Sequence, residues 1–169
     1  MVRSRSAVRT RGRRVSAAAA PMIAVAITCA TAAYAEPAAG YRMTLLPTLR
    51  ACDFEQVEHV SGRTFARPDA EITAAGSRVV ARVDMAYGVP DARYVVRLIP
   101  APHPVLGCLA GDPSITTGTL NTDDDGSGVA TLQSDVTPGS RGVWLAIDLP
   151  AMHSQTPEEF YSSTYIAAV

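Results

Sequence analysis

The sequence predicts an all-β fold in which two antiparallel sheets pack face to face. Short runs of residues alternate between apolar and polar side chains, which is the period of a strand with one face in a core. Twelve prolines and twelve glycines punctuate the chain, and the runs between turns follow at near-even spacing without a long helical pattern. Together these three observations favour an antiparallel β-sandwich.

Seven segments fit strands of such a sandwich. Pro47 ends the first segment, an edge strand, and Pro100 and Pro102 are expected to end the third. In chain order the expected strands are 41–46, 78–87, 93–100, 115–120, 129–136, 143–149 and 161–167. Three other segments are less defined: 50–59 fits a strand or a helical turn, 61–69 is expected to be a loop, and 71–73 is too short to assign.

The most explicit turn lies between the fourth and fifth of these segments. Residues 121–128 are rich in Asn, Asp and Gly, which tolerate positive φ and satisfy local backbone donors. This turn is expected to join 115–120 and 129–136 as a hairpin.

Trp144, the only Trp, lies in the strand expected over 143–149. Alternation turns Val143, Leu145 and Ile147 toward the core and Trp144 toward the other face of its sheet. Two interpretations remain open. Trp144 could form an exposed platform with Tyr161 and Tyr165 that binds a sugar, a lipid or a protein, because flat aromatic area binds at little entropic cost. Alternatively, a loop or the segment 52–59 covers Trp144, which is the more usual fate of a large aromatic.

The first 35 residues have the features of a secretory signal peptide. Residues 1–14 contain six arginines and no acid, an Ala-rich apolar run follows, and Ala33-Tyr34-Ala35 is an A-x-A cleavage site. An uncleaved signal anchor is the alternative.

Cleavage leaves 36–169 as a single β-sandwich domain, secreted or held in the cell envelope. The absence of lysine, with abundant Ala and Arg, is typical of a high-GC bacterium.

Charge excludes two classes of partner. Residues 36–169 carry sixteen acidic side chains against nine arginines, a net charge of −7. Nucleic acid and anionic lipid both require a basic surface, so neither is expected as a partner. Nor is stable membrane insertion expected after cleavage.

Cys52 and Cys108 are the two cysteines that follow the cleavage site. In an oxidising compartment such a pair is expected to form a disulfide, worth about 4 kcal/mol on the chain-entropy model.

The predicted organisation resembles an immunoglobulin-like or related antiparallel sandwich. It departs from true immunoglobulin domains because Trp144 follows both cysteines instead of lying between them.

The acidic turn also matches the first half of a calcium loop. Asn121, Asp123 and Asp125 occupy the first three ligand positions, and a glycine follows where the loop bends. The position that requires a bidentate Glu is Leu132. A plain acidic turn is therefore favoured, with a weak calcium site as the alternative.

No motif for catalysis is present. His59, His103 and His153 lack a second ligand at helical spacing, and the chain has neither a Gly-x-Ser-x-Gly elbow nor a Ser-x-x-Lys motif. The sequence therefore favours a non-catalytic binding or structural module without a cofactor, acting on an envelope component or a protein that the sequence does not identify. A calcium-dependent module is the first alternative, and an enzyme with a site assembled from distant residues is the second.

Overall fold

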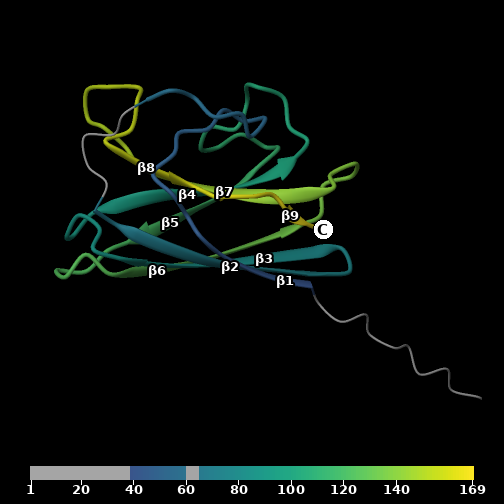
Figure 1. Cartoon of the computed structure of the whole chain (residues 1–169), viewed down its shortest axis with the longest axis horizontal. Coiled ribbons are helices and arrows are strands. Elements are labelled where there is room, and N and C mark those ends of the chain that lie inside the picture. The colour runs from purple at the N-terminus through teal and green to yellow at the C-terminus, as the bar shows by residue number, and fades with distance from the viewer. Residues whose placement is uncertain (1–38, 60–64) are drawn as a thin grey trace, which may run out of the picture. The chain divides into compact units, whose positions relative to one another are not determined.

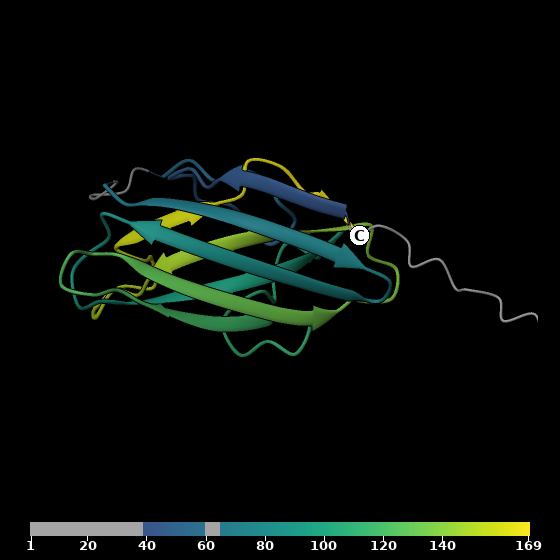
Figure 2. The ribbon, with the colours of Figure 1, turned by 90° about the horizontal axis from the view of Figure 1, so that it is seen from below.

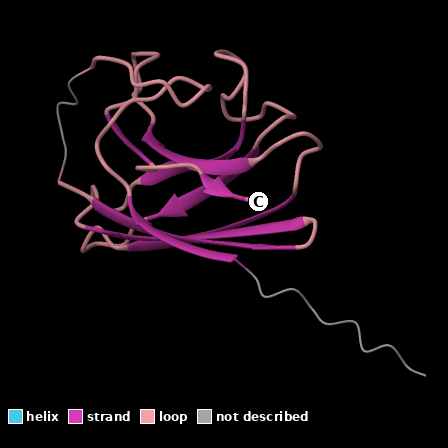
Figure 3. Cartoon of the chain, turned by 45° about the vertical axis from the view of Figure 1, so that its right-hand side comes forward, coloured by secondary structure: helices cyan, strands magenta, loops and turns pink. Residues whose placement is uncertain are grey.

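A computed structural model describes residues 39–59 and 65–169, and within them it consists of strands, turns and loops without helices (Figure 3). The strands form two antiparallel sheets, so the prediction of an all-β fold with two sheets is confirmed (Figure 1). The predicted signal peptide lies outside the described residues. In those residues no helix is long or apolar enough to span a membrane.

The first sheet has the strand order β1-β2-β3-β6, seen side by side in Figure 2. Its strands are β1 Ala39–Thr44, β2 Arg67–Ala75, β3 Arg78–Ala86 and β6 Gly128–Asp135. The edge position of β1 agrees with the prediction for 41–46. The nine-residue strand β2 replaces the loop and the short unassigned segment expected from the sequence, where Pro68, Ala70 and Ile72 are the inward positions and only Ile72 has a large apolar side chain.

The second sheet has the order β5-β4-β7-β8, with the short β9 also paired to β7. Its strands are β4 Arg93–Ala101, β5 Thr116–Asn121, β7 Gly142–Leu149, β8 Glu159–Ser162 and β9 Ala167–Ala168. Strand β4 runs through Pro100, which was expected to end it. The pairing of β4 with β5 stops at Leu98, so the missing N–H of Pro100 costs no bond on that side.

The predicted hairpin between the fourth and fifth segments does not form. Strand β5 pairs with β4 in the second sheet, whereas β6 pairs with β3 in the first. The acidic turn therefore carries the chain from one sheet to the other. Leu120 at the end of β5 and Leu132 in β6 both enter the core between the sheets, which satisfies the same alternation that suggested a hairpin.

Among the described residues, Glu159 is the one acidic side chain buried in the core between the sheets. The hydroxyls of Tyr94 and Tyr161 donate to its Oε2 atom at 2.8 and 3.2 Å. Each tyrosine oxygen also accepts a backbone N–H, from Val89 at 2.9 Å and from Ala66 at 3.2 Å respectively. Burial, together with the neighbouring carboxylate, raises the pKa of both tyrosines.

Candidate functional site

The outer face of the second sheet is covered by loops. In Figure 1 they lie on the side of the second sheet that faces away from the first. The covering segments are the connections β1–β2, β4–β5 and β7–β8. Beneath them a second apolar cluster forms, consisting of Cys52, Ile99, Ala101, Cys108, Trp144 and Ala146. The second sheet is therefore buried on both faces.

Trp144 belongs to this outer cluster and is 1% exposed. Its ring lies 5.3 Å from that of Phe54, in an edge-on arrangement. The strand alternation placed it on the correct face of the sheet, and the segment 52–59 contributes to its cover. Trp144 therefore packs as a core residue under a loop, as the second of the two interpretations expected.

The three aromatic residues proposed as a ligand surface do not lie together. Tyr161 faces the core between the sheets and is 1% exposed, on the opposite side of the second sheet from Trp144. Tyr165 is 39% exposed, its hydroxyl donates to the carbonyl of Arg42, and its ring packs edge-on against Tyr41. The expectation of a shared aromatic platform is therefore wrong, because the rings divide between two faces.

Cys52 and Cys108 form the expected disulfide, with their Cα atoms 5.5 Å apart. Cys52 lies in the β1–β2 connection and Cys108 in the β4–β5 connection. The bond therefore ties two of the three covering loops to each other above Trp144. This arrangement fixes the walls of a groove on the same face.

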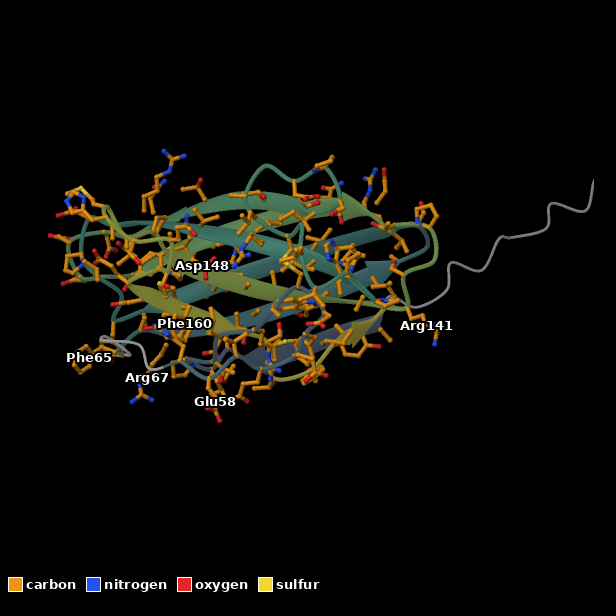
Figure 4. The ribbon with its side chains drawn as sticks, turned by 90° about the horizontal axis from the view of Figure 1, so that it is seen from above. Glu58, Phe65, Arg67, Arg141, Asp148 and Phe160 are labelled. Atoms are coloured by element: carbon orange, nitrogen blue, oxygen red, sulfur yellow. A yellow bond between two sulfur atoms is a disulfide. The ribbon has the colours of Figure 1, made fainter. Side chains whose placement is uncertain are left out.

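The groove has a volume of about 500 Å³. Val95 and Arg97 of β4 and Asp148 of β7 contribute to it from the sheet, and residues of all three covering loops line its sides. Figure 4 looks onto this face and shows Asp148 among the side chains that crowd it. A concave site of this size, mostly apolar with a few polar groups, has the properties of a small-molecule site.

Arg97 and Asp148 form an ion pair in the groove. Nη2 of Arg97 donates to Oδ2 of Asp148, and the two side chains are only 11% and 17% exposed. Nη1 of Arg97 donates to the carbonyl of Cys108 at 2.7 Å, which attaches the β4–β5 loop to the sheet. Burial raises the pKa of Asp148, and the positive charge of Arg97 works against that shift.

Arg50 is the second cation of the groove. Its Nη1 donates to the carbonyl of Phe54 at 2.8 Å, and its guanidinium lies 4.0 Å from the centre of the Phe54 ring. Burial lowers the pKa of Arg50. The Nε atoms of Arg50 and Arg97 are both buried and have no acceptor among the described residues.

Apolar side chains extend outward from the loops around the groove. Leu109 is 75% exposed and Met152 is 85% exposed, and Val105 and Leu106 of the β4–β5 loop are exposed as well. Leu109 and Val105 line the groove itself. The opening thus combines these apolar side chains with the exposed polar side chains of Ser154 and Gln155, which also line the groove.

The groove residues were not predicted as a site. Arg97 and Asp148 fall on outward positions of two predicted strands, where a charged side chain is ordinarily solvated. The only signal was that these strands carry strong apolar residues on both faces, which indicates that the outward face is covered too. Arg50 lies in a segment whose structure the sequence left undecided.

The acidic turn is held by its own backbone. Oδ1 of Asp123 accepts the N–H groups of Asp125 at 3.0 Å and Ser127 at 2.8 Å. Asn121 ends β5 and pairs with Arg93. No group of three or more His, Cys, Asp or Glu side chains in 39–59 and 65–169 is placed to hold a metal ion. Calcium binding at Asn121, Asp123 and Asp125 therefore stays a prediction.

The histidines lie apart from the groove lining. His59 packs against Phe160, with ring centres 5.6 Å apart, and His153 is exposed in the β7–β8 loop. His103 contacts Ser114, Nε2 to Oγ, at 2.9 Å, and that Oγ donates to Asp112 at 2.5 Å.

Ser114, His103 and Asp112 are the residue types of a catalytic triad in a different order. A triad places the histidine between the serine and the acid, so that the imidazole can remove the hydroxyl proton. Here the serine lies between the other two, and its hydroxyl and its backbone N–H both bind Asp112. These bonds lower the pKa of Asp112. The arrangement joins parts of one loop and does not have the order of a catalytic triad.

Comparison with family models, curated proteins and solved structures finds no match to this chain.

Proposed function

We propose that this protein is a non-catalytic binding module of the bacterial envelope or the extracellular space, and that its ligand occupies the groove over the second sheet. The observation that carries this proposal is the groove itself, about 500 Å³ in volume and lined by residues from three loops and two central strands. Rigid strands beneath and a disulfide across the loops supply the preorganisation that a binding site needs.

The location outside the cytoplasm is supported by two observations. Residues 1–35 have the composition of a cleavable signal peptide. Cys52 and Cys108 are paired, and structural disulfides persist in oxidising compartments.

We also propose that the sandwich is of the immunoglobulin-like class. Two features of the strand order support this. If β1 is set aside, β2, β3 and β6 follow the order of strands A, B and E in one immunoglobulin sheet, and β4, β7 and β8 follow the order of C, F and G in the other. The disulfide supports no such assignment, because it joins two loops and not two sheets.

A binding role is favoured over catalysis by the chemistry of the groove. Its carboxylate, Asp148, is bonded to Arg97 through Oδ2, and no second carboxylate lines the groove among the described residues to act with it. The described residues that line the groove include the hydroxyls of Ser154 and Thr156, but no histidine that could activate them.

A fragment screen with a groove-filling variant tests this proposal. Ala151 lines the groove, so Ala151→Trp is expected to fill it, whereas Ala75→Trp places the same side chain at the exposed end of β2. We expect small molecules that raise the unfolding midpoint of the wild-type chain to raise that of Ala75→Trp equally, and to lose their effect on Ala151→Trp. Hits that stabilise all three proteins equally, or that are chemically converted, would contradict the proposal.

A further inference from the structure

The groove carries a positive charge although the rest of the domain is acidic. Arg50, Arg97 and Asp148 are the charged residues among the described residues that line it, which leaves one positive charge in excess. Residues 36–169 as a whole carry a net charge of −7. A single negative charge on a ligand would balance the charges of the lining residues, and a second negative charge would be repelled by Asp148 and by Glu55 near Arg50.

The two arginines also have hydrogen-bond donors without acceptors. A guanidinium presents five N–H donors in a planar fork. Arg97 directs its Nη groups to Asp148 and to the Cys108 carbonyl, and Arg50 directs Nη1 to the Phe54 carbonyl. In each side chain the buried Nε is left without an acceptor in the described part of the chain. Because these Nε atoms are closed off from solvent, a ligand in the groove can reach only the other N–H groups of the guanidinium forks.

Arg50 is the better placed of the two to bind a ligand. The charge of Arg97 is already balanced by Asp148, so a second anion there would compete with an existing ion pair. No groove-lining carboxylate is bonded to Arg50; the exposed Glu55 acts on it through its charge, and the ring of Phe54 lies against its guanidinium. A planar anion can accept two parallel hydrogen bonds from one edge of such a fork.

The remaining walls define the rest of the ligand. Leu49, Val95, Val105, Leu109, Pro150 and Pro157 all line the groove. These side chains offer contact to an apolar body, and the lining side chains of Ser154, Gln155 and Thr156 add hydrogen-bonding groups beside them. A volume of about 500 Å³ suits a small molecule and is too small for a folded partner.

We propose that the groove binds a small carboxylic acid with an apolar body, its carboxylate against Arg50 and its apolar part along the walls formed by the loops. This inference rests on the proposed binding function and names the chemical class of its ligand. The excess of one positive charge favours a carboxylate over a phosphate, because a phosphate near neutral pH carries up to two negative charges.

Four probes with the same eight-carbon chain test the inference: octanoate, octan-1-ol, octylamine and octyl phosphate. Their dissociation constants are measured by calorimetry on the full-length oxidised chain, and backbone amide shifts of Val95 and Leu109 report whether each probe enters the groove. We expect octanoate to bind at least tenfold more tightly than octan-1-ol, since a charge-assisted bidentate pair forms only with the acid.

Two variants assign the effect to Arg50. Arg50→Met is expected to weaken octanoate binding about tenfold and to leave octan-1-ol binding unchanged. Arg42→Met is the matched control, because Arg42 is an exposed arginine paired with Glu71 on the other sheet. Circular dichroism checks that each variant folds. If Arg50→Met does not fold, Arg50→Lys keeps the charge, loses the planar fork, and is expected to weaken octanoate binding by a smaller factor.

The outcomes separate the inference from the function on which it rests. Equal binding of octanoate and octan-1-ol in the groove would overturn the carboxylate class and leave the binding function standing. Tighter binding of octyl phosphate or octylamine would also overturn the class alone. If no probe shifts the groove amides and the fragment screen finds no groove ligand either, both proposals fail.

Discussion

Arg97 and Asp148 illustrate how an ordinary pair of charges becomes structural when loops cover it. Both side chains occupy outward positions on central strands, where water would normally solvate them. Here the β4–β5 and β7–β8 loops remove that water, and each charge depends on the other for compensation. Desolvating two charges is costly, so the pair holds the loop in place at little net gain in stability.

Breaking this pair on one side is expected to destabilise the protein. Arg97→Met leaves the Asp148 carboxylate buried without a countercharge, which we expect to lower the free energy of unfolding by about 3 kcal/mol. Replacing both residues, as in Arg97→Met with Asp148→Leu, is expected to cost less than the sum of the two single changes. Urea unfolding of the four proteins measures the coupling. Strictly additive losses would show that the pair is solvated.

At the scale of elements, the covering loops depend on the disulfide. Replacing Cys52 and Cys108 together by serine is expected to lower the free energy of unfolding by about 4 kcal/mol or less. The β1–β2 and β4–β5 loops should separate, and Trp144 should emit at longer wavelength as water reaches it. The far-ultraviolet circular dichroism should keep its β-sheet form, because the core between the sheets does not include the disulfide. Loss of that signal would show that the loops and the sandwich unfold as one.

The acidic connection between the sheets gives a second prediction at this scale. Asp123→Ala removes the acceptor of two backbone N–H groups in an exposed turn, so we expect a loss of about 1 kcal/mol in both calcium and chelator. Asp124→Ala, at an exposed position of the same turn, is the control and should change little. A wild-type midpoint that rises with calcium, and does not rise in Asp123→Ala, would instead support the calcium site.

The sequence was sufficient to predict most strands, because a strand can be recognised without knowing which strand it pairs with. Strands β3, β4, β6 and β7 follow from alternation alone, because a strand shows its period whichever sheet it joins. It was not sufficient to predict pairing: β5 and β6 read as a hairpin because a turn sequence specifies a reversal and not the sheet on either side. The groove was missed because it forms where Arg50, Arg97 and Asp148 converge from segments distant in the chain.

At the scale of the whole molecule, the buried Glu159 with its two tyrosines makes stability sensitive to alkaline pH. In the unfolded chain Tyr94 and Tyr161 lose their protons near their ordinary pKa of 10.0, whereas in the folded protein the raised pKa values keep both protonated at higher pH. The unfolded state then binds fewer protons, so the free energy of unfolding falls as pH rises above about 10.

With both tyrosines contributing, the slope is expected to approach about 2.7 kcal/mol per pH unit. Tyr94→Phe should reduce it to about half, in addition to a loss of about 1 kcal/mol at neutral pH from the missing hydrogen bond to Glu159. Urea titrations between pH 9 and 11 measure both effects. A stability that stays level across this range would mean that water reaches the two hydroxyls.

The two loops that wall the groove are joined only in molecules in which the disulfide between Cys52 and Cys108 has formed. The core between the sheets does not include the disulfide, whereas the two loops that wall the groove are covalently joined to each other only after oxidation. A copy that stays in a reducing compartment would thus keep its sandwich core but lack the covalent link between the two loops that wall the groove. Maturation, and not folding alone, would decide which molecules carry the site.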